Sequence, residues 1–159
     1  MIVIYRFLGK QFGLIPDSEE DEFRLEQVNA TIHDFLAEGV NAFHGKDPVA
    51  SYSIQKEETQ PYIDRFVTTR LPRFLNHFEK ILTHNRKSAW LVGDKVTYGD
   101  LGLLHVIRAT EAQFPQKWDE LKTTLPKVVN LKKSLEDDPN LKAYFASERC
   151  PNFGGDSMM

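Results

Sequence analysis

The segment SAWLVGDKVTYGDLGLL (residues 88–104) decides the fold, because it specifies how one helix begins. An apolar entry passes through a Gly-Asp turn and reaches Thr97, which stands at the N-cap position with Asp100 at N3. This spacing is that of a capping box, in which each side chain binds a backbone N–H that has no partner at the helix start. Val96 and Leu101 occupy the two positions of a hydrophobic staple. The segment therefore predicts a well-capped helix that begins directly after Thr97.

Apolar residues recur at helical spacing on both sides of this segment, and strand-like alternation never extends beyond a few residues. The sequence therefore predicts an all-α helical bundle built on two long antiparallel helices. The first long helix follows Asp17 and ends before Lys46, and the second runs from about Gln55 to Asn85. Three to five shorter helices are expected beside them: residues 2–12, residues 98–114, a short turn near Trp118, residues 126–135 and a last helix that begins at Asp138-Pro139.

Three details of these helices are specific enough to be tested. The N-terminal run MIVIYRFLGK is interpreted as the start of a buried helix, which Gly13 ends. Asp17 is the expected N-cap of the first long helix, with Glu20 at N3. Pro72 lies within the second long helix, where it removes a hydrogen bond, so a kink is expected there.

Composition limits the possible functions. The chain has 159 residues, of which 41% are hydrophobic and 27% charged, and its formal net charge is −3, so one globular domain without affinity for nucleic acid is expected. A lone Cys150 fits a reducing compartment, which favours the cytoplasm. No segment has the length of a membrane span, and no membrane partner is expected. Residues 1–149 should form the domain, followed by a flexible tail at 150–159.

Sequence motifs of catalysis are absent. The chain has no dinucleotide fingerprint, phosphate-binding loop, nucleophile elbow or zincin motif. His77 and His84 lie close to one helix face but seven residues apart, which is too far for a shared metal ion without a third ligand. No metal site is therefore expected, and both histidines are interpreted as surface residues.

Five segments stand out between Ile2 and about Arg149: Tyr5-Arg6-Phe7-Leu8-Gly9, Val28-Asn29 to Asp34, Leu71-Pro72-Arg73-Phe74-Leu75 with Glu79 to Leu82, residues 88–104, and Asp138-Pro139 to Tyr144. In order and in spacing they together resemble the helical C-terminal domain of cytosolic glutathione transferases. The resemblance is strongest to the alpha, mu, pi and sigma classes.

The resemblance implies that the thiol chemistry lies outside these residues. In the family a thioredoxin-like domain precedes the helical one and carries the tyrosine that activates glutathione, so the resemblance implies that Met1 corresponds to a position near the domain junction. Glutathione would be a substrate of the complete form, no cofactor is implied, and no residue of this chain is expected to be catalytic. The family also implies a homodimer.

Three residues of this chain match family binding positions. By the Val-Asn-x4-Asp spacing, Asp34 corresponds to an aspartate that reaches across the dimer to the amino group of the neighbour's glutathione. The acceptor-substrate pocket is expected to include Val40 and His44, although the pi-class pattern has a tyrosine where this chain has His44. Thr97 and Asp100 are expected to be structural.

Two functions follow. In the first, the chain is the acceptor-substrate and dimerisation domain of a glutathione transferase and is inactive alone. In the second, it is a non-catalytic protein-interaction module of the same fold. A third reading, a carrier with a cavity between the long helices, has only general apolar character in its favour.

Overall fold

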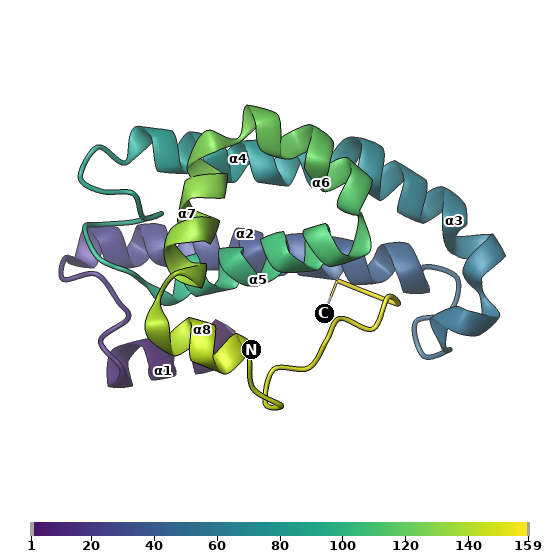
Figure 1. Cartoon of the computed structure of the whole chain (residues 1–159), viewed down its shortest axis with the longest axis horizontal. Helices are drawn as coiled ribbons and strands as arrows, with labels where there is room; N and C mark the ends of the chain where they lie inside the picture. The colour runs from purple at the N-terminus through teal and green to yellow at the C-terminus, as the bar shows by residue number, and fades with distance from the viewer. Residues whose placement is uncertain (1, 159) are drawn as a thin grey trace.

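The computed structural model describes residues 2–158, and the side chains of residues 3–158, as helices joined by loops and without a strand (Figure 1). The prediction of an all-α fold is confirmed. The α-helices are α1 (Ile2–Gln11), α2 (Glu19–His44), α3 (Lys56–Arg65), α4 (Leu71–His84), α5 (Tyr98–Gln113), α6 (Pro115–Leu121), α7 (Pro126–Glu136) and α8 (Pro139–Phe145). Within residues 2–158, none of these helices combines the length and apolar character needed to cross a lipid bilayer.

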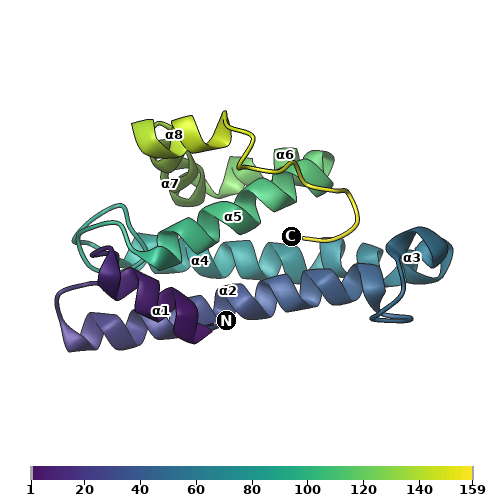
Figure 2. The same ribbon diagram turned by 90° about the horizontal axis from the view of Figure 1, so that it is seen from below.

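Two long helical rods form the centre of the molecule, as the sequence predicts. One rod is α2, and the other comprises α3, a π-helical turn at Phe66–Arg70, and α4, which returns antiparallel to α2. Helix α5 packs against α2, and α7 crosses α4 and α5 (Figure 1). Figure 2 shows α7 and α8 on one side of α5 and the two long rods on the other.

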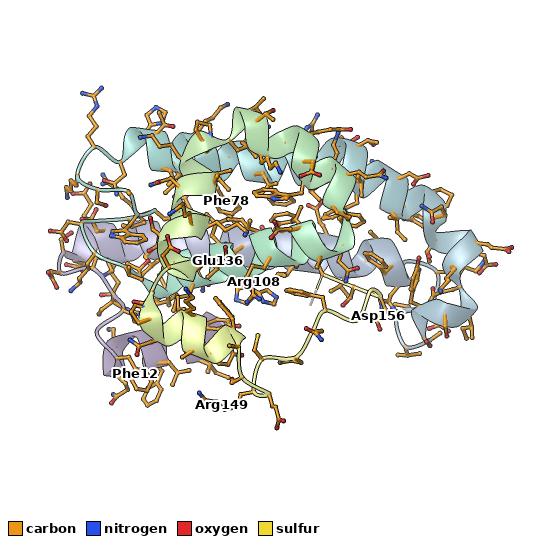
Figure 3. All side chains as sticks on the ribbon, in the orientation of Figure 1. Phe12, Phe78, Arg108, Glu136, Arg149 and Asp156 are labelled. Carbon is orange, nitrogen blue, oxygen red and sulfur yellow. The ribbon has the colours of Figure 1, made fainter. Side chains whose placement is uncertain are left out.

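The core lies between the long rods and α5. Phe35 of α2 stacks on Phe74 of α4 with ring centroids 4.8 Å apart, and both rings are buried. Offset stacking adds to the area that aromatic rings bury, so this pair contributes directly to the packing of the two rods. Phe78 lies inside the bundle, whereas Phe12 lies at its outer edge (Figure 3).

Asp100 organises the start of α5. Its Oδ2 accepts the Thr97 backbone N–H at 2.8 Å and the Thr97 hydroxyl at 2.7 Å, and the capping box is present. Its Oδ1 accepts the Leu91 N–H at 2.8 Å, so the same carboxylate also holds the preceding loop. Burial raises the pKa of Asp100, while these three donors act in the opposite direction.

Helix α1 corrects one expectation, because its apolar side chains are exposed rather than buried. Val3 is 79% and Phe7 61% exposed, whereas Gly9 is buried. A Cβ at Gly9 would lie 2.5 Å from the Tyr98 ring, so α1 approaches the start of α5 closely at a residue without a side chain. Residue periodicity identified the helix but not which neighbour, if any, covers its apolar side.

The start of α2 lies one residue after the predicted cap. Ser18 is the N-cap and its hydroxyl accepts the Asp21 N–H at 3.2 Å. The Asp17 carboxylate instead forms an ion pair with Lys95, with Nζ and Oδ1 2.6 Å apart. Asp17 is therefore engaged by the loop before α5, which leaves the capping role to its neighbour.

The irregularity expected at Pro72 takes the form of a π-helical turn directly before it. Residues 66–70 form this wider turn, and α4 then begins with Pro72 in its first positions. A π turn relieves the clash between a proline ring and the carbonyl four residues earlier, here that of Thr68. Figure 1 shows α3 bending away from the line of α4 at this point.

The C-terminal segment returns to the bundle near α2 and α5 (Figures 1 and 2). Met158 is fully buried, and a Cβ at Gly39 of α2 would lie 2.9 Å from the Met158 Cβ. Gln113 at the end of α5 donates a hydrogen bond to the Ser157 carbonyl. The flexibility predicted for residues 150–159 stays a prediction. In the structure, Ser157 and Met158 of this segment pack against α5 and α2.

Candidate functional site

Helix α2 carries all three residues that the sequence assigns to binding. Val40 and His44 are one turn apart and share a face, whereas Asp34 lies about 120° from Val40 around the helix axis. Asp34 is exposed, and the other two are half-buried. The structure thus brings Val40 and His44 together and places Asp34 on a separate side.

The side of α2 that carries Asp34 faces the π-helical turn. One turn after Asp34, the Glu38 carboxylate accepts two hydrogen bonds from the Arg70 guanidinium, at 2.6 and 2.5 Å. Glu38 and Arg70 line a cavity of about 320 Å³ with Tyr62 and Arg65. The paired guanidinium fixes Glu38, and Asp34 remains the exposed carboxylate on this side of the helix.

His44 has a local structural contact. Its Nδ1 lies 3.1 Å from the Ala50 carbonyl oxygen, which joins the end of α2 to the loop before α3. Neither His44 nor Val40 lines the cavity beside Glu38. The proposed acceptor-pocket role of the two residues therefore stays a prediction, and one imidazole nitrogen of His44 is already engaged by the protein.

Two polar side chains on α2 lack hydrogen-bond partners among the residues that the structure describes. Asn29 Nδ2 and His33 Nε2 are buried atoms one helical turn apart, and the Tyr5 ring of α1 lies 5.5 Å from the His33 ring. Buried amides and imidazoles without partners are costly in folded proteins. This part of α2 thus has unused hydrogen-bonding capacity beside the exposed helix α1.

The largest of the described cavities is a groove of about 680 Å³ between α2, α4 and the loop that follows α4. We call it the basic groove, because its lining includes Arg24, Lys80, Arg86 and Lys87 and one carboxylate, that of Asp21. Its apolar lining residues are Val28, Ile81, Leu91 and Val92.

Sequence reasoning missed the basic groove, although a signal for it is present. His77, Lys80 and His84 follow a helical spacing on α4, and Arg86-Lys87 extend this basic run into the loop. Each residue alone is typical of a solvated surface. The groove arises only when Arg24, from the other long rod, is placed opposite the run.

Thr97 and Asp100 are both fully buried. The Thr97 N–H and hydroxyl both donate hydrogen bonds to the Asp100 carboxylate at the start of α5, which agrees with a structural role. Within the described part of the chain, no group of three or more His, Cys, Asp or Glu side chains is placed to hold a metal ion.

Comparison with known proteins points to one family. Residues 43–148 match the family profile described as glutathione S-transferase, C-terminal domain. The chain is 26% identical over 149 residues to a glutathione S-transferase of Plasmodium yoelii yoelii, covering 92% of this chain and 61% of that protein. It is 27% identical over 150 residues to glutathione S-transferase P of Bos taurus, covering 94% and 63%.

Comparison of the fold with solved structures points to the same family. The crystal structure of the glutathione S-transferase Blo t 8 superposes with a TM-score of 0.76 at 22% identity, covering 99% of this chain and 68% of that chain. The present chain spans about three fifths of the length of the curated relatives given above. The profile match covers more than half of the chain, and the fold agrees with it. The chain therefore belongs to the glutathione S-transferase family, of which it has the C-terminal helical domain.

Proposed function

We propose that this chain is the acceptor-substrate and dimerisation domain of a glutathione transferase that conjugates glutathione to electrophiles in the cytoplasm. In this proposal the thiol is activated by a thioredoxin-like domain of the family type, and this chain alone is inactive. The single observation that carries the proposal is the match of residues 43–148 to the family profile. Asp34 lies before that range, and its role rests on the resemblance of the Val-Asn-x4-Asp spacing.

The chemistry of Asp34 supports this assignment. A carboxylate opposite the α-ammonium group of glutathione forms a charge-assisted hydrogen bond, which is stronger than one between neutral groups. Glu38, one turn later, is held by Arg70, whereas Asp34 has no ion pair among the described residues. Asp34 is thus available to a ligand or to a partner subunit.

The exposed apolar side of α1 also supports the proposal. Val3, Ile4 and Phe7 of α1, and Phe12 directly after it, are each more than half exposed, which is unusual for neighbouring large apolar residues. A family member has a further domain next to this helix, and such a domain would remove these side chains from water.

A chimera tests the role of Asp34. The N-terminal part of the Bos taurus relative, up to the start of its match to this chain, is joined to Met1, and glutathione conjugation is measured for the parent and for Asp34→Asn. The proposal expects KM for glutathione to rise about tenfold, since a hydrogen bond to a charged group contributes about 1.5–3 kcal/mol. Asp94→Asn, at an exposed aspartate in the loop before α5, is the matched control. Equal KM values in the two variants would contradict the assignment.

A second function, that of a non-catalytic interaction module, is favoured by the same exposed residues of α1. A partner protein could cover them without any thiol chemistry. Light scattering of the purified chain checks this: self-association or a stable complex supports it, whereas a strictly monomeric chain that binds no partner contradicts it.

A further inference from the structure

We propose that the basic groove is a docking site for an acidic, extended segment of a partner protein. The inference goes beyond the proposed function, because it uses none of Asp34, Val40 and His44. It rests on the charge, the shape and the lining of the groove between α2, α4 and the loop after α4.

The charge of the groove is opposite to that of the chain. Arg24, Lys80, Arg86 and Lys87 line it, in a protein whose formal net charge is −3. Lys87 and Arg24 both contact Asp21, at 3.2 Å each, and hydrogen bonding to Lys87 lowers the pKa of Asp21. The single carboxylate of the groove is thus already shared by two cations.

Two of the cations are uncompensated. Among the residues that the structure describes, no carboxylate forms an ion pair with Lys80 or Arg86, although many other surface cations of this chain have one. His77 and His84 face the same groove from α4, and the His84 Nδ1 is engaged by the Lys80 carbonyl at 2.6 Å. The groove therefore presents positive potential to a ligand that brings carboxylates.

The shape of the groove favours an extended peptide. Its lining on α2 runs from Asp21 to Thr31, about 15 Å at the helical rise of 1.5 Å per residue. An extended chain advances about 3.3 Å per residue, so roughly four or five residues fit along it. Val28, Ile81, Leu91 and Val92 supply apolar contacts for alternate side chains of such a segment.

The arrangement of the cations favours an acidic protein segment over other anionic ligands. They come from α2, α4 and the loop and are spread along the groove, whereas a small anion is best bound by donors that converge on one point. The lining contains no Phe, Tyr or Trp side chain on which nucleic acid bases could stack. A segment that alternates acidic and apolar residues matches both the spread charges and the apolar lining.

Fluorescence anisotropy with a labelled peptide tests the proposal. The probe is a peptide of about eight residues that alternates Glu and Leu, which is long enough to span the groove, and its neutral counterpart alternates Gln and Leu. The intact chain should bind the acidic peptide, and raising the salt from about 0.05 M to about 0.5 M should weaken binding. Lys80→Ser with Arg86→Ser should reduce the affinity about tenfold.

The matched control is Lys56→Ser with Lys142→Ser, which removes the same charge from exposed positions of α3 and α8. It should leave the affinity within about twofold, since neither residue lines the groove. Gln27→Trp fills the groove without changing charge and should also weaken binding. Urea unfolding of each variant verifies that the fold is intact, so that loss of binding reports on the groove.

Four results would overturn the proposal. The neutral peptide could bind as tightly as the acidic one, or the control pair could weaken binding as much as the groove pair. An aryl sulfonate or an oligonucleotide of the same charge could bind the groove more tightly than the peptide, which would assign it to another class of ligand. The groove pair could convert a dimer to a monomer, which would make the groove a subunit interface. None of these outcomes depends on glutathione conjugation, so the proposed function is tested separately.

Discussion

Asp100 shows at the scale of a single residue how one side chain can fix both a helix start and a loop. Its carboxylate accepts hydrogen bonds from the Thr97 N–H, the Thr97 hydroxyl and the Leu91 N–H, all inside the protein. The contact with Thr97 was predicted from their spacing. The contact with Leu91 was not, because it depends on the path of the loop, which local spacing does not determine.

Removal of this carboxylate should be costly. Asp100→Ala leaves buried donors of Thr97 and Leu91 without partners, so the free energy of unfolding should fall by about 2–4 kcal/mol. Urea denaturation measures the loss, with Asp94→Ala as an exposed control in the loop before α5. A loss at Asp100 no larger than at Asp94 would contradict the structural role.

Substitutions at Gly39 and Met158 can test whether the C-terminal segment is docked against α2 in solution. A methyl group at Gly39 would overlap the buried Met158 side chain, so Gly39→Ala should destabilise the chain by about 1–3 kcal/mol where Met158 is docked. In the Met158→Ala background this cost should largely disappear, because the obstacle is gone. A double-mutant cycle measured by urea unfolding gives the coupling. An unchanged cost in both backgrounds would favour the flexible tail that the sequence predicts.

Helices differ in how much of their environment the sequence determines. The helices expected at residues 2–12, 98–114 and 126–135 begin and end within a few residues of those bounds, because caps, prolines and apolar periodicity are local signals. The π-helical turn before Pro72 was seen only as a kink, since the proline predicts an interruption but not how the chain accommodates it. The exposure of α1 depends on which surfaces surround it, and periodicity carries no information about that.

Ion pairs join helix α1 to α2. Arg6 donates to Glu22 at 2.7 Å, and Lys10 lies 3.3 Å from the same carboxylate. Hydrogen bonding to Arg6 is the main reason that the pKa of Glu22 is lowered from its ordinary value. The Arg6–Glu22 pair therefore contributes its full stability when the pH is above the ordinary pKa of a glutamate. This stability is lost as the pH falls through the lowered pKa of Glu22.

Hydrogen exchange can measure this attachment. Protection factors of the α1 amides should fall as the pH drops from about 6 to about 3, while those of α4 change less, because α4 is held by buried apolar packing. At neutral pH, α1 should also be less protected than Leu71–His84. Arg6→Gln should lower the protection of α1 at neutral pH and reduce its pH dependence. Protection of α1 equal to that of α4 at every pH would show that the ion pairs do not control the attachment.

At the scale of the whole molecule, the fold class and the family follow from the sequence, and the surface properties do not. The order of helices and the ordered family segments are local features spread over the chain. The basic groove and the burial of Met158 instead join residues far apart in sequence. The separation of Asp34 from Val40 around α2 could be derived from helix geometry alone. The sequence of this chain does not determine which molecule covers α1 or binds in the basic groove, because that depends on the partner.

In the proposed function, this helical domain supplies binding surfaces and a separate domain of the complete enzyme activates the thiol. This division is tested by the rate at which the purified 159-residue chain conjugates glutathione to an activated aryl chloride at neutral pH. We expect a rate equal to that of the reaction without protein. Turnover that is proportional to the concentration of the purified chain would contradict it, because the reactive thiolate would then be stabilised by residues of these helices.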